Sequence, residues 1–213
     1  MNKQTGITKD NAISFLIQCY FGRIDDPILS AIDRAYLDMQ THTLSGEQEE
    51  LYYGRKIVTE KLYNAIDGIE KASSFETWHR DTAEIMKKNY PKLSYGQIQK
   101  WINMSIKYLY TLKLLGIDGI SDYFNSANSE NFHPALDSYV LNAIGEDIKW
   151  STIAEYETYN KIQKKLTFAD EYINWPQYAY NAGLKKNGER KIPEKGTYKR
   201  YVLDNKGYSF VSK

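Results

Sequence analysis

The stretch from Leu93 to Leu115 constrains the fold of this chain more than any other. It begins with a turn signal, Ser94-Tyr95-Gly96, and then apolar residues recur at helical spacing. One face carries Trp101, Ser105, Tyr108, Leu112 and Leu115, and the same face is widened by Ile98, Ile102, Ile106 and Leu109. The pattern predicts a central helix whose broad apolar face must be covered by other elements.

The segment from Met86 to Ile117, which includes this helix, contains six lysines and no carboxylate. The six are Lys87, Lys88, Lys92, Lys100, Lys107 and Lys113. A solvated helix usually mixes both signs, because Glu–Lys pairs support it. Lys100 and Lys107 are separated by about two turns, so both ammonium groups point the same way, set against the apolar face. A one-signed stretch around a glycine turn predicts an anionic partner.

Charge is unevenly distributed along the 213 residues, which are enough for one large domain or two small lobes. Residues 184–213 carry nine Lys/Arg and three Asp/Glu, a net charge of +6, so the preceding part carries −5 of the total of +1. An acidic body with a basic central stretch and a basic tail favours directed nucleic-acid binding. We therefore divide the chain into a helical domain, residues 1–183, and a basic C-terminal extension, residues 184–213.

Helical periodicity and capping signals recur along the rest of the chain. Helices are expected from Asp10 to about Tyr20, Asp26-Pro27 to about Met39, Ser45 to about Ile69, Ser73 to Pro91, Thr152 to Leu166 and Asp170 to Tyr180. A further helix is expected after Pro134, with Asp137 in its first turn and Ile144 on its apolar face. A short helical turn is expected over 119–124 and a polar loop over 125–133, and Pro176 must bend or end its helix. The tail alternates about a turn, which predicts a hairpin from about Tyr198 to Val211. The fold class is therefore all-α, with a small C-terminal β-hairpin.

Several kinds of site and location find no support. No window approaches about 18 uncharged apolar residues, and no long apolar run follows the first residues, so we expect no membrane span, no signal peptide and a cytoplasmic protein. Cys19 is the only cysteine, and its apolar helix favours a position in the core. His42, His79 and His133 lack metal-ligand spacing and no Gly-rich phosphate loop is present, so we expect no metal and no cofactor.

Between Leu93 and Ile144, about a quarter of the chain, the order of motifs resembles the helix-hairpin-helix DNA glycosylases. It is most similar to the compact archaeal branch of the 8-oxoguanine glycosylases. The matching positions are Gly96, Gln99-Lys100, Lys107, Pro134 and Asp137. This chain has a single glycine where the family has Gly-x-Gly, and Pro-x-x-Asp where it commonly has Pro-x-Asp. The resemblance implies a two-lobed helical fold with DNA in the cleft between the lobes.

The resemblance also implies roles for three of these residues. Lys100 would attack C1′ of the deoxyribose as a neutral amine, and Asp137 would stabilise the positive charge that develops on the sugar. A free lysine is neutral in only about 1 in 2,500 molecules at pH 7, so a nearby second ammonium would help. Lys107 would supply that support or contact a phosphate, and which of the two lysines is the nucleophile stays open. Without the resemblance, both lysines read as the solvated border of a helix and Asp137 as a helix cap.

A base pocket and a backbone contact complete the expected site. By resemblance, Trp175 would stack on an extruded base, and Glu171, one turn before it, would accept hydrogen bonds from that base. A core tryptophan beside a surface glutamate fits the same spacing. Gln18 is a candidate for reading a base edge. The turn expected to contact the DNA backbone consists of Ser94, Tyr95, Gly96 and Gln97.

The function expected from the sequence is excision of a damaged or modified base, with abasic-site lyase activity through a lysine Schiff base. The partner would be double-stranded DNA with a flipped nucleotide, bound by a monomer. Oxidised guanine is the family's substrate, and a modified base of invading phage DNA is the alternative. The rival reading is a non-catalytic helical module that binds DNA or another protein and needs neither Lys100 nor Asp137.

Overall fold

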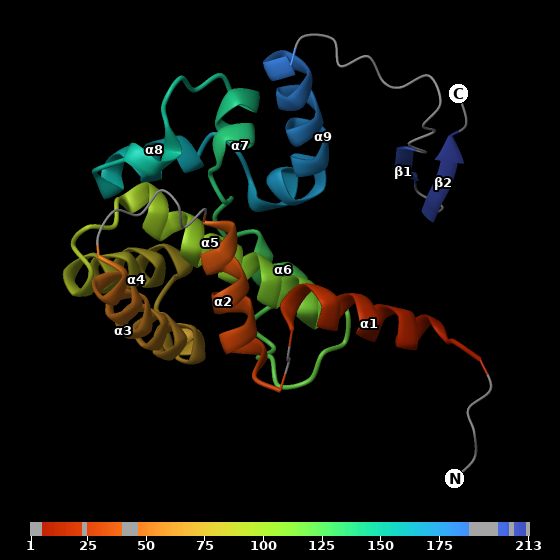
Figure 1. Cartoon of the computed structure of the whole chain (residues 1–213), viewed down its shortest axis with the longest axis horizontal. Coiled ribbons are helices and arrows are strands. Elements are labelled where there is room, and N and C mark those ends of the chain that lie inside the picture. Colours follow the sequence, from red (N-terminus) through yellow and green to blue (C-terminus); the bar gives the residue numbers. More distant parts are fainter. Residues whose placement is uncertain (1–5, 23–24, 40–46, 188–199, 205–206, 212–213) are drawn as a thin grey trace. The chain divides into compact units, whose positions relative to one another are not determined.

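The chain is mostly helical, and the predicted all-α class is confirmed. The computed structural model describes residues 6–22, 25–39, 47–187, 200–204 and 207–211, with side chains up to Asn181. The longer helices are α1 (Lys9–Phe21), α2 (Pro27–Asp38), α3 (Gln48–Asp67), α4 (Phe75–Asn89), α5 (Tyr95–Leu114), α8 (Tyr156–Gln163) and α9 (Phe168–Asn187). The short ones are η2 (Ile69–Lys71), α6 (Ser126–Ser129), α7 (Ser138–Ala143) and η3 (Trp150–Thr152) (Figure 1).

Helix α5 is the element on which the others pack. A capping box fixes its start: Ser94 Oγ accepts from the Gln97 N–H at 3.1 Å, and Gln97 Oε1 accepts from the Ser94 N–H at 2.9 Å. The helix packs against α2, α4, α8 and η3. In Figure 1, α2, α3 and α4 lie below α5, whereas α7 and α8 lie above it. The predicted central helix is therefore present and central.

Burial of α5 extends well beyond the predicted apolar face. Trp101 is fully buried, stacks near Tyr36 with ring centroids 4.9 Å apart, and donates from Nε1 to the Ile32 carbonyl at 3.0 Å. Polar residues on other faces are buried as well, among them Gln99 and Lys100. The expectation that Lys100 lies on the solvated border of this helix was wrong, because neighbouring elements cover that border too.

Three helix starts differ from those predicted. Thr8, rather than Asp10, caps α1, and Ser74, one residue after the predicted cap, caps α4 by accepting from the Thr77 N–H at 3.1 Å. Helix α8 begins only at Tyr156, because residues 150–152 form η3. The predicted cap at Ser45 lies outside the described residues, and α3 begins after Glu47, whose side chain makes no capping hydrogen bond.

Helix formation also differs in the second half of the chain. The expected turn over 119–124 is not helical, whereas the expected loop contains α6, which Asn125 caps by accepting from the Asn128 N–H at 3.0 Å. Asp137 is the N-cap of α7 rather than a residue of its first turn. Helix α9 begins at Phe168 and continues through Pro176, so the proline does not end it.

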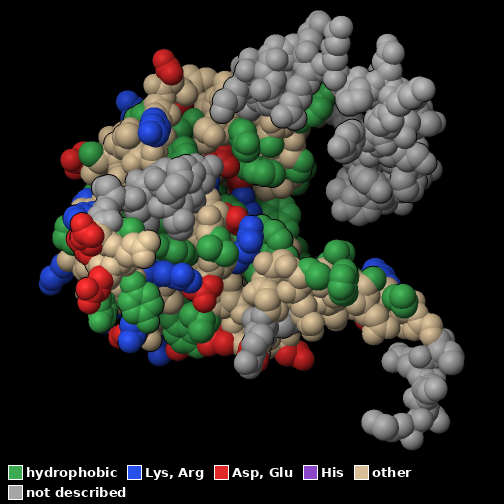
Figure 2. Space-filling view, in the orientation of Figure 1, with side chains coloured by type: hydrophobic (Ala, Val, Ile, Leu, Met, Phe, Trp, Pro, Cys, Tyr) green, Lys and Arg blue, Asp and Glu red, His purple; other side chains and the backbone are tan. Residues whose placement is uncertain are grey.

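Helix α1 buries little of its surface. Ile17 is its buried residue, whereas Phe15 and Leu16 are 66% and 64% exposed, and apolar side chains lie along its surface in Figure 2. Cys19 is exposed, so the expectation that it belongs to the core was wrong. The apolar periodicity of this helix predicted more burial than its packing against α2 provides.

The chain divides into two compact units, residues 1–179 and 180–213. The division falls within α9, four residues before the boundary expected from the charge distribution. In the second unit, β1 (Arg200–Asp204) and β2 (Gly207–Val211) pair antiparallel, with Arg200 opposite Val211 and Asp204 opposite Gly207. This is the segment in which the sequence predicts a hairpin.

Candidate active site

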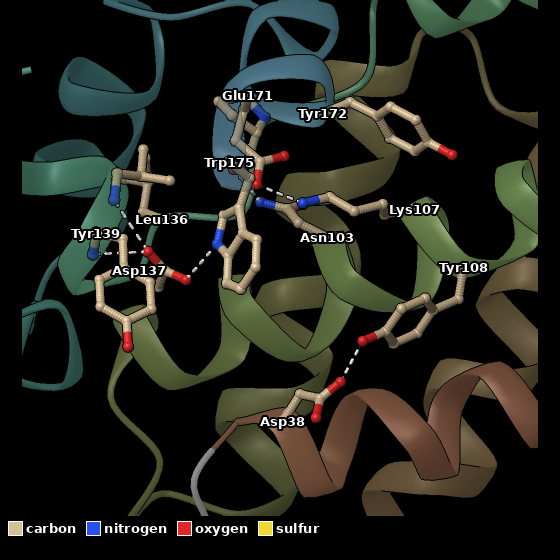
Figure 3. Close-up of polar contacts among 12 residues, drawn as sticks. Asp38, Asn103, Lys107, Tyr108, Leu136, Asp137, Tyr139, Glu171, Tyr172 and Trp175 are labelled. Atoms are coloured by element: carbon tan, nitrogen blue, oxygen red, sulfur yellow. Dashed lines mark hydrogen bonds and ion pairs between the residues drawn. The ribbon is translucent and has the colours of Figure 1, made fainter. Parts of the chain in front are cut away.

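A cavity of about 400 Å³ brings together four of the residues singled out in the sequence. Its lining residues come from α1, α2, α5, the start of α7 and α9, and they are Tyr20, Asp38, Lys100, Met104, Lys107, Tyr108, Asp137, Tyr139, Tyr172, Trp175 and Pro176. Lys100, Lys107, Asp137 and Trp175 therefore line one space. Figure 3 shows Lys107, Asp137 and Trp175. A second hollow, of about 420 Å³ beside the start of α2, is lined by carboxylates and apolar groups and contains no lysine.

Lys100 is the most unusual cation of the cavity. Its residue is only 5% exposed, and its Nζ lies 4.6 Å from the centroid of the Trp150 ring. Burial lowers the pKa of the Lys100 ammonium, and the nearby charge of Lys107 lowers it further, whereas the carboxylates of Asp137 and Asp38 raise it. The lowering prevails, so the neutral amine is more populated than in a free lysine.

Asp137 is held by three N–H groups. Its Oδ1 accepts from the backbone N–H groups of Tyr139 at 2.8 Å and Val140 at 3.0 Å, which is how it caps α7. Its Oδ2 accepts from the Trp175 indole N–H at 2.9 Å (Figure 3). The carboxylate is only 8% exposed, and its position beside the cavity is thereby fixed from two elements.

Gln99 joins the segments that carry Lys100 and Asp137. Its Nε2 donates to the Leu136 carbonyl at 2.8 Å, and its Oε1 accepts from the Leu136 N–H at 3.1 Å. Asn103, one turn further along α5, donates from Nδ2 to the Pro134 carbonyl at 2.9 Å. Both amide side chains belong to α5 and bind the backbone just before Asp137, so the carboxylate is fixed relative to Lys100 on the same helix.

A buried network of histidine and tyrosine side chains holds Asn103 in place. His79 lies with Nε2 2.9 Å from Asn103 Oδ1 and Nδ1 2.9 Å from the Tyr156 hydroxyl, and His133 Nδ1 lies 2.8 Å from the Tyr159 hydroxyl. Burial lowers the pKa of both histidines, to about 4 for His133. Both rings are therefore neutral at pH 7, and each accepts and donates as a fixed part of the scaffold.

Lys107 and Glu171 form an ion pair at the edge of the cavity (Figure 3). Glu171 is fully buried and is not among the lining residues, so its expected role of contacting a base has no direct opening to the cavity. Burial raises the pKa of Glu171, and the charge and hydrogen bond of Lys107 oppose that rise. Trp175, four residues later, is 38% exposed and lines the cavity, so it is not the core tryptophan that the alternative reading required.

The other expected site residues lie away from this cavity. Gln18 is exposed on α1 and is not a lining residue. At the start of α5, Gly96 is buried: its N–H donates to the Ile153 carbonyl at 3.2 Å, and a Cβ there would lie 1.6 Å from the Trp150 carbonyl oxygen. The turn formed by Ser94, Tyr95, Gly96 and Gln97 thus packs on η3, and its residues 94 and 95 are half-buried.

Sequence reasoning missed the wall formed by Tyr20, Asp38 and Tyr108. Tyr20 and Tyr108 follow the apolar periodicity of their helices, and Asp38 lies at the end of an ordinary helix, so none of the three carries a signal for a site. Gln99 and Asn103 carried a usable signal, because two amide side chains one turn apart interrupt an otherwise apolar helix. Neither residue could be matched to a partner without the fold.

In the described part of the chain, no group of three or more His, Cys, Asp and Glu side chains is arranged to hold a metal ion. No described helix combines the length and apolarity needed to cross a bilayer. The chain matches no protein-family model, no curated protein and no solved structure.

Proposed function

We propose that this chain is a DNA glycosylase with abasic-site lyase activity, in which Lys100 is the nucleophile and Asp137 the assisting carboxylate. The observation that carries the proposal is that a buried lysine with a lowered pKa and a fixed carboxylate line the same cavity. They come from distant parts of the chain and correspond to the motif that resembles the helix-hairpin-helix glycosylases. Perturbed lysines in a cavity are typical of nucleophilic sites.

The chemistry requires a nucleotide extruded from the duplex into the cavity. As the bond between C1′ and the base breaks, its electron pair leaves with the base, which takes up a proton. Positive charge develops on the sugar, and the carboxylate of Asp137 stabilises it. The neutral Lys100 amine bonds to C1′ and gives up a proton, which balances the proton taken up by the departing base. The C1′–O4′ bond then breaks as O4′ takes up a proton from water, which leaves a protonated Schiff base. Loss of a C2′ proton to water expels the 3′ phosphate and cuts the strand.

The electrostatics of the cavity fit the role of Lys100. Burial and Lys107 both lower its pKa, so the fraction of neutral amine rises. Lys107 keeps its own carboxylate partner, Glu171, at the edge of the cavity. This arrangement supports Lys100 over Lys107 as the nucleophile, because the Lys107 Nζ is already held in an ion pair with the buried Glu171 carboxylate.

Borohydride trapping on DNA with a preformed abasic site tests the lysine. The wild-type chain should form a covalent adduct, and Lys100→Gln should abolish it. Lys113→Gln is the matched control, because Lys113 lies on the same helix and pairs with Asp122 at 2.7 Å outside the cavity. An adduct that persists in Lys100→Gln and disappears in Lys107→Gln would move the nucleophile to Lys107. An adduct that survives both substitutions would refute the proposed chemistry.

Asp137→Asn separates an enzyme from a non-catalytic DNA-binding module. The amide retains an oxygen that can accept from the amides of α7, so the cap and the fold should be largely kept. In a glycosylase, base release should fall while duplex binding stays within a small factor. Unchanged behaviour of Asp137→Asn, together with no base released by the wild-type chain from any modified duplex, favours the binding module.

A further inference from the structure

Two tyrosines and one aspartate form a hydrogen-bonded group on one wall of the cavity. Tyr20 from α1, Asp38 from α2 and Tyr108 from α5 all line the cavity. The Tyr108 hydroxyl donates to Asp38 Oδ2 (Figure 3). The Tyr20 hydroxyl lies 3.2 Å from the same oxygen, and the hydroxyl oxygens of Tyr20 and Tyr108 are 2.9 Å apart. We name these three residues the acceptor triad.

The protons of the triad are all used within it. Tyr108 directs its proton to Asp38, and Tyr20 directs its own to Asp38 or to Tyr108. Burial and the hydrogen bond to Asp38 raise the pKa of the Tyr108 phenol, so this proton stays in place at neutral pH. A carboxylate has no proton to give. Whichever way Tyr20 turns, the triad has only lone pairs left to offer to a ligand.

Arg34 holds Asp38 and Tyr20 in position. Its Nη2 donates to Asp38 Oδ1 at 2.6 Å, and its guanidinium lies 4.1 Å from the centroid of the Tyr20 ring. Lys100 and Lys107 on α5 also line the cavity and bring N–H donors to it.

We infer that the acceptor triad is a specificity site that selects bases whose facing edge carries N–H or NH₂ donors. Exocyclic amines, as on cytosine-, adenine- and guanine-type bases, meet the lone pairs, whereas a carbonyl at the same position meets them oxygen to oxygen. The inference rests on the proposed function, because it takes the flipped base as the ligand. Unpaired polar groups left in a closed site are the strongest source of such discrimination.

Matched pairs of bases test the inference. Duplexes would contain 5-hydroxymethylcytosine or 5-hydroxymethyluracil, 8-oxoadenine or 8-oxohypoxanthine, and 8-oxoguanine or 8-oxohypoxanthine, so the members of each pair differ at an amine. The wild-type chain should release the amine-bearing member about 10-fold to 100-fold faster in every pair that it processes. Asp38→Asn, which turns an acceptor into a group that also donates, should bring that ratio to about one or below.

Controls keep the outcomes distinct. Asp33→Asn is the matched variant, because Asp33 lies on the same helix and pairs with Arg55 at 2.7 Å outside this cavity, and it should keep the wild-type ratio. Tyr108→Phe is a second triad variant, for use if Asp38→Asn fails to fold. It should also lower the ratio of the release rates of the two bases in each pair. Adduct formation on abasic DNA, where no base is read, should persist in both triad variants. It should be faster in Asp38→Asn, because this substitution removes a carboxylate that raises the pKa of Lys100.

Two results would overturn the inference while leaving the lysine chemistry intact. One is faster or equal release, by the wild-type chain, of the members that lack the amine. The other is an unchanged ratio in Asp38→Asn and Tyr108→Phe. An abasic-site adduct without release of any tested base also counts against the triad as a base reader. Loss of the Lys100-dependent adduct itself would instead refute the proposed function.

Discussion

Replacing Gln99 tests whether the lysine and the carboxylate are held together as the structure indicates. Gln99→Met keeps the length of the side chain and removes both bonds to the Leu136 peptide. That peptide is buried, so its N–H and C=O lose their partners at about 1–3 kcal/mol each, and the free energy of unfolding should fall by about 2–6 kcal/mol. Urea denaturation followed by circular dichroism measures the loss.

Function should respond more selectively than stability. Asp137 follows Leu136 directly, so loss of the two hydrogen bonds between Gln99 and Leu136 lets the carboxylate shift relative to Lys100. A misplacement of about 1 Å costs about 100-fold in rate, and base release from folded Gln99→Met should fall by about that factor. Adduct formation on abasic DNA should fall far less, because no base has to depart and less charge needs stabilising on the sugar.

A second buried glutamine provides the control for Gln99→Met. Gln163 on α8 is 5% exposed and donates to Asn160 at 2.9 Å, and it does not line the cavity. Gln163→Met should cost about 1 kcal/mol and leave base release unchanged. If Gln99→Met lost no more stability than Gln163→Met and released bases at the wild-type rate, the hydrogen bonds from Gln99 to Leu136 would not be what fixes Asp137 relative to Lys100.

Two further predictions concern the backbone and the pH dependence. Gly96→Ala should destabilise the fold by about 3 kcal/mol in thermal unfolding, because its Cβ would lie 1.6 Å from the Trp150 carbonyl oxygen. Gly68→Ala is the control: its Cβ would lie 3.4 Å from the Asn64 carbonyl oxygen, and the free energy of unfolding should change by less than about 1 kcal/mol. The rate of adduct formation should rise with pH up to the pKa of Lys100, which lies below that of a free lysine. Lys107→Gln removes a like charge, so the rise in rate should move to higher pH. A pH–rate profile that stays in place or moves to lower pH in this variant would contradict the assigned electrostatics.

Local sequence signals predicted what local chemistry determines. The start of α5 was predicted from Ser94 and Gly96, because a capping side chain and its amide partners lie within one turn. The start of α2 was predicted from Asp26-Pro27 for the same reason. The cap at Asp137 was predicted as an alternative to catalysis, and in the structure the residue is indeed an N-cap.

Tertiary packing decided what the sequence left open. Lys100 has the same helical spacing whether its border is solvated or covered, so only the packing around α5 reveals its burial. Tyr108 shares the spacing of core residues, yet its hydroxyl reaches Asp38 across the cavity. Pro176 was expected to disturb α9, but its missing N–H costs only one intrahelical bond, and the helix continues.

Asp137 shows how a structural role and the proposed catalytic role can be compatible. The two amides at the start of α7 fix Oδ1, so the carboxylate cannot turn away from the cavity without giving up the cap. The remaining oxygen, Oδ2, meets the indole N–H of Trp175, a residue that is 38% exposed on the cavity wall. Any ligand that displaces this indole would bare Oδ2 toward the cavity, and it is this oxygen that the proposed mechanism places next to the developing positive charge. The alternatives of cap and catalyst are therefore assigned to different oxygens of one side chain.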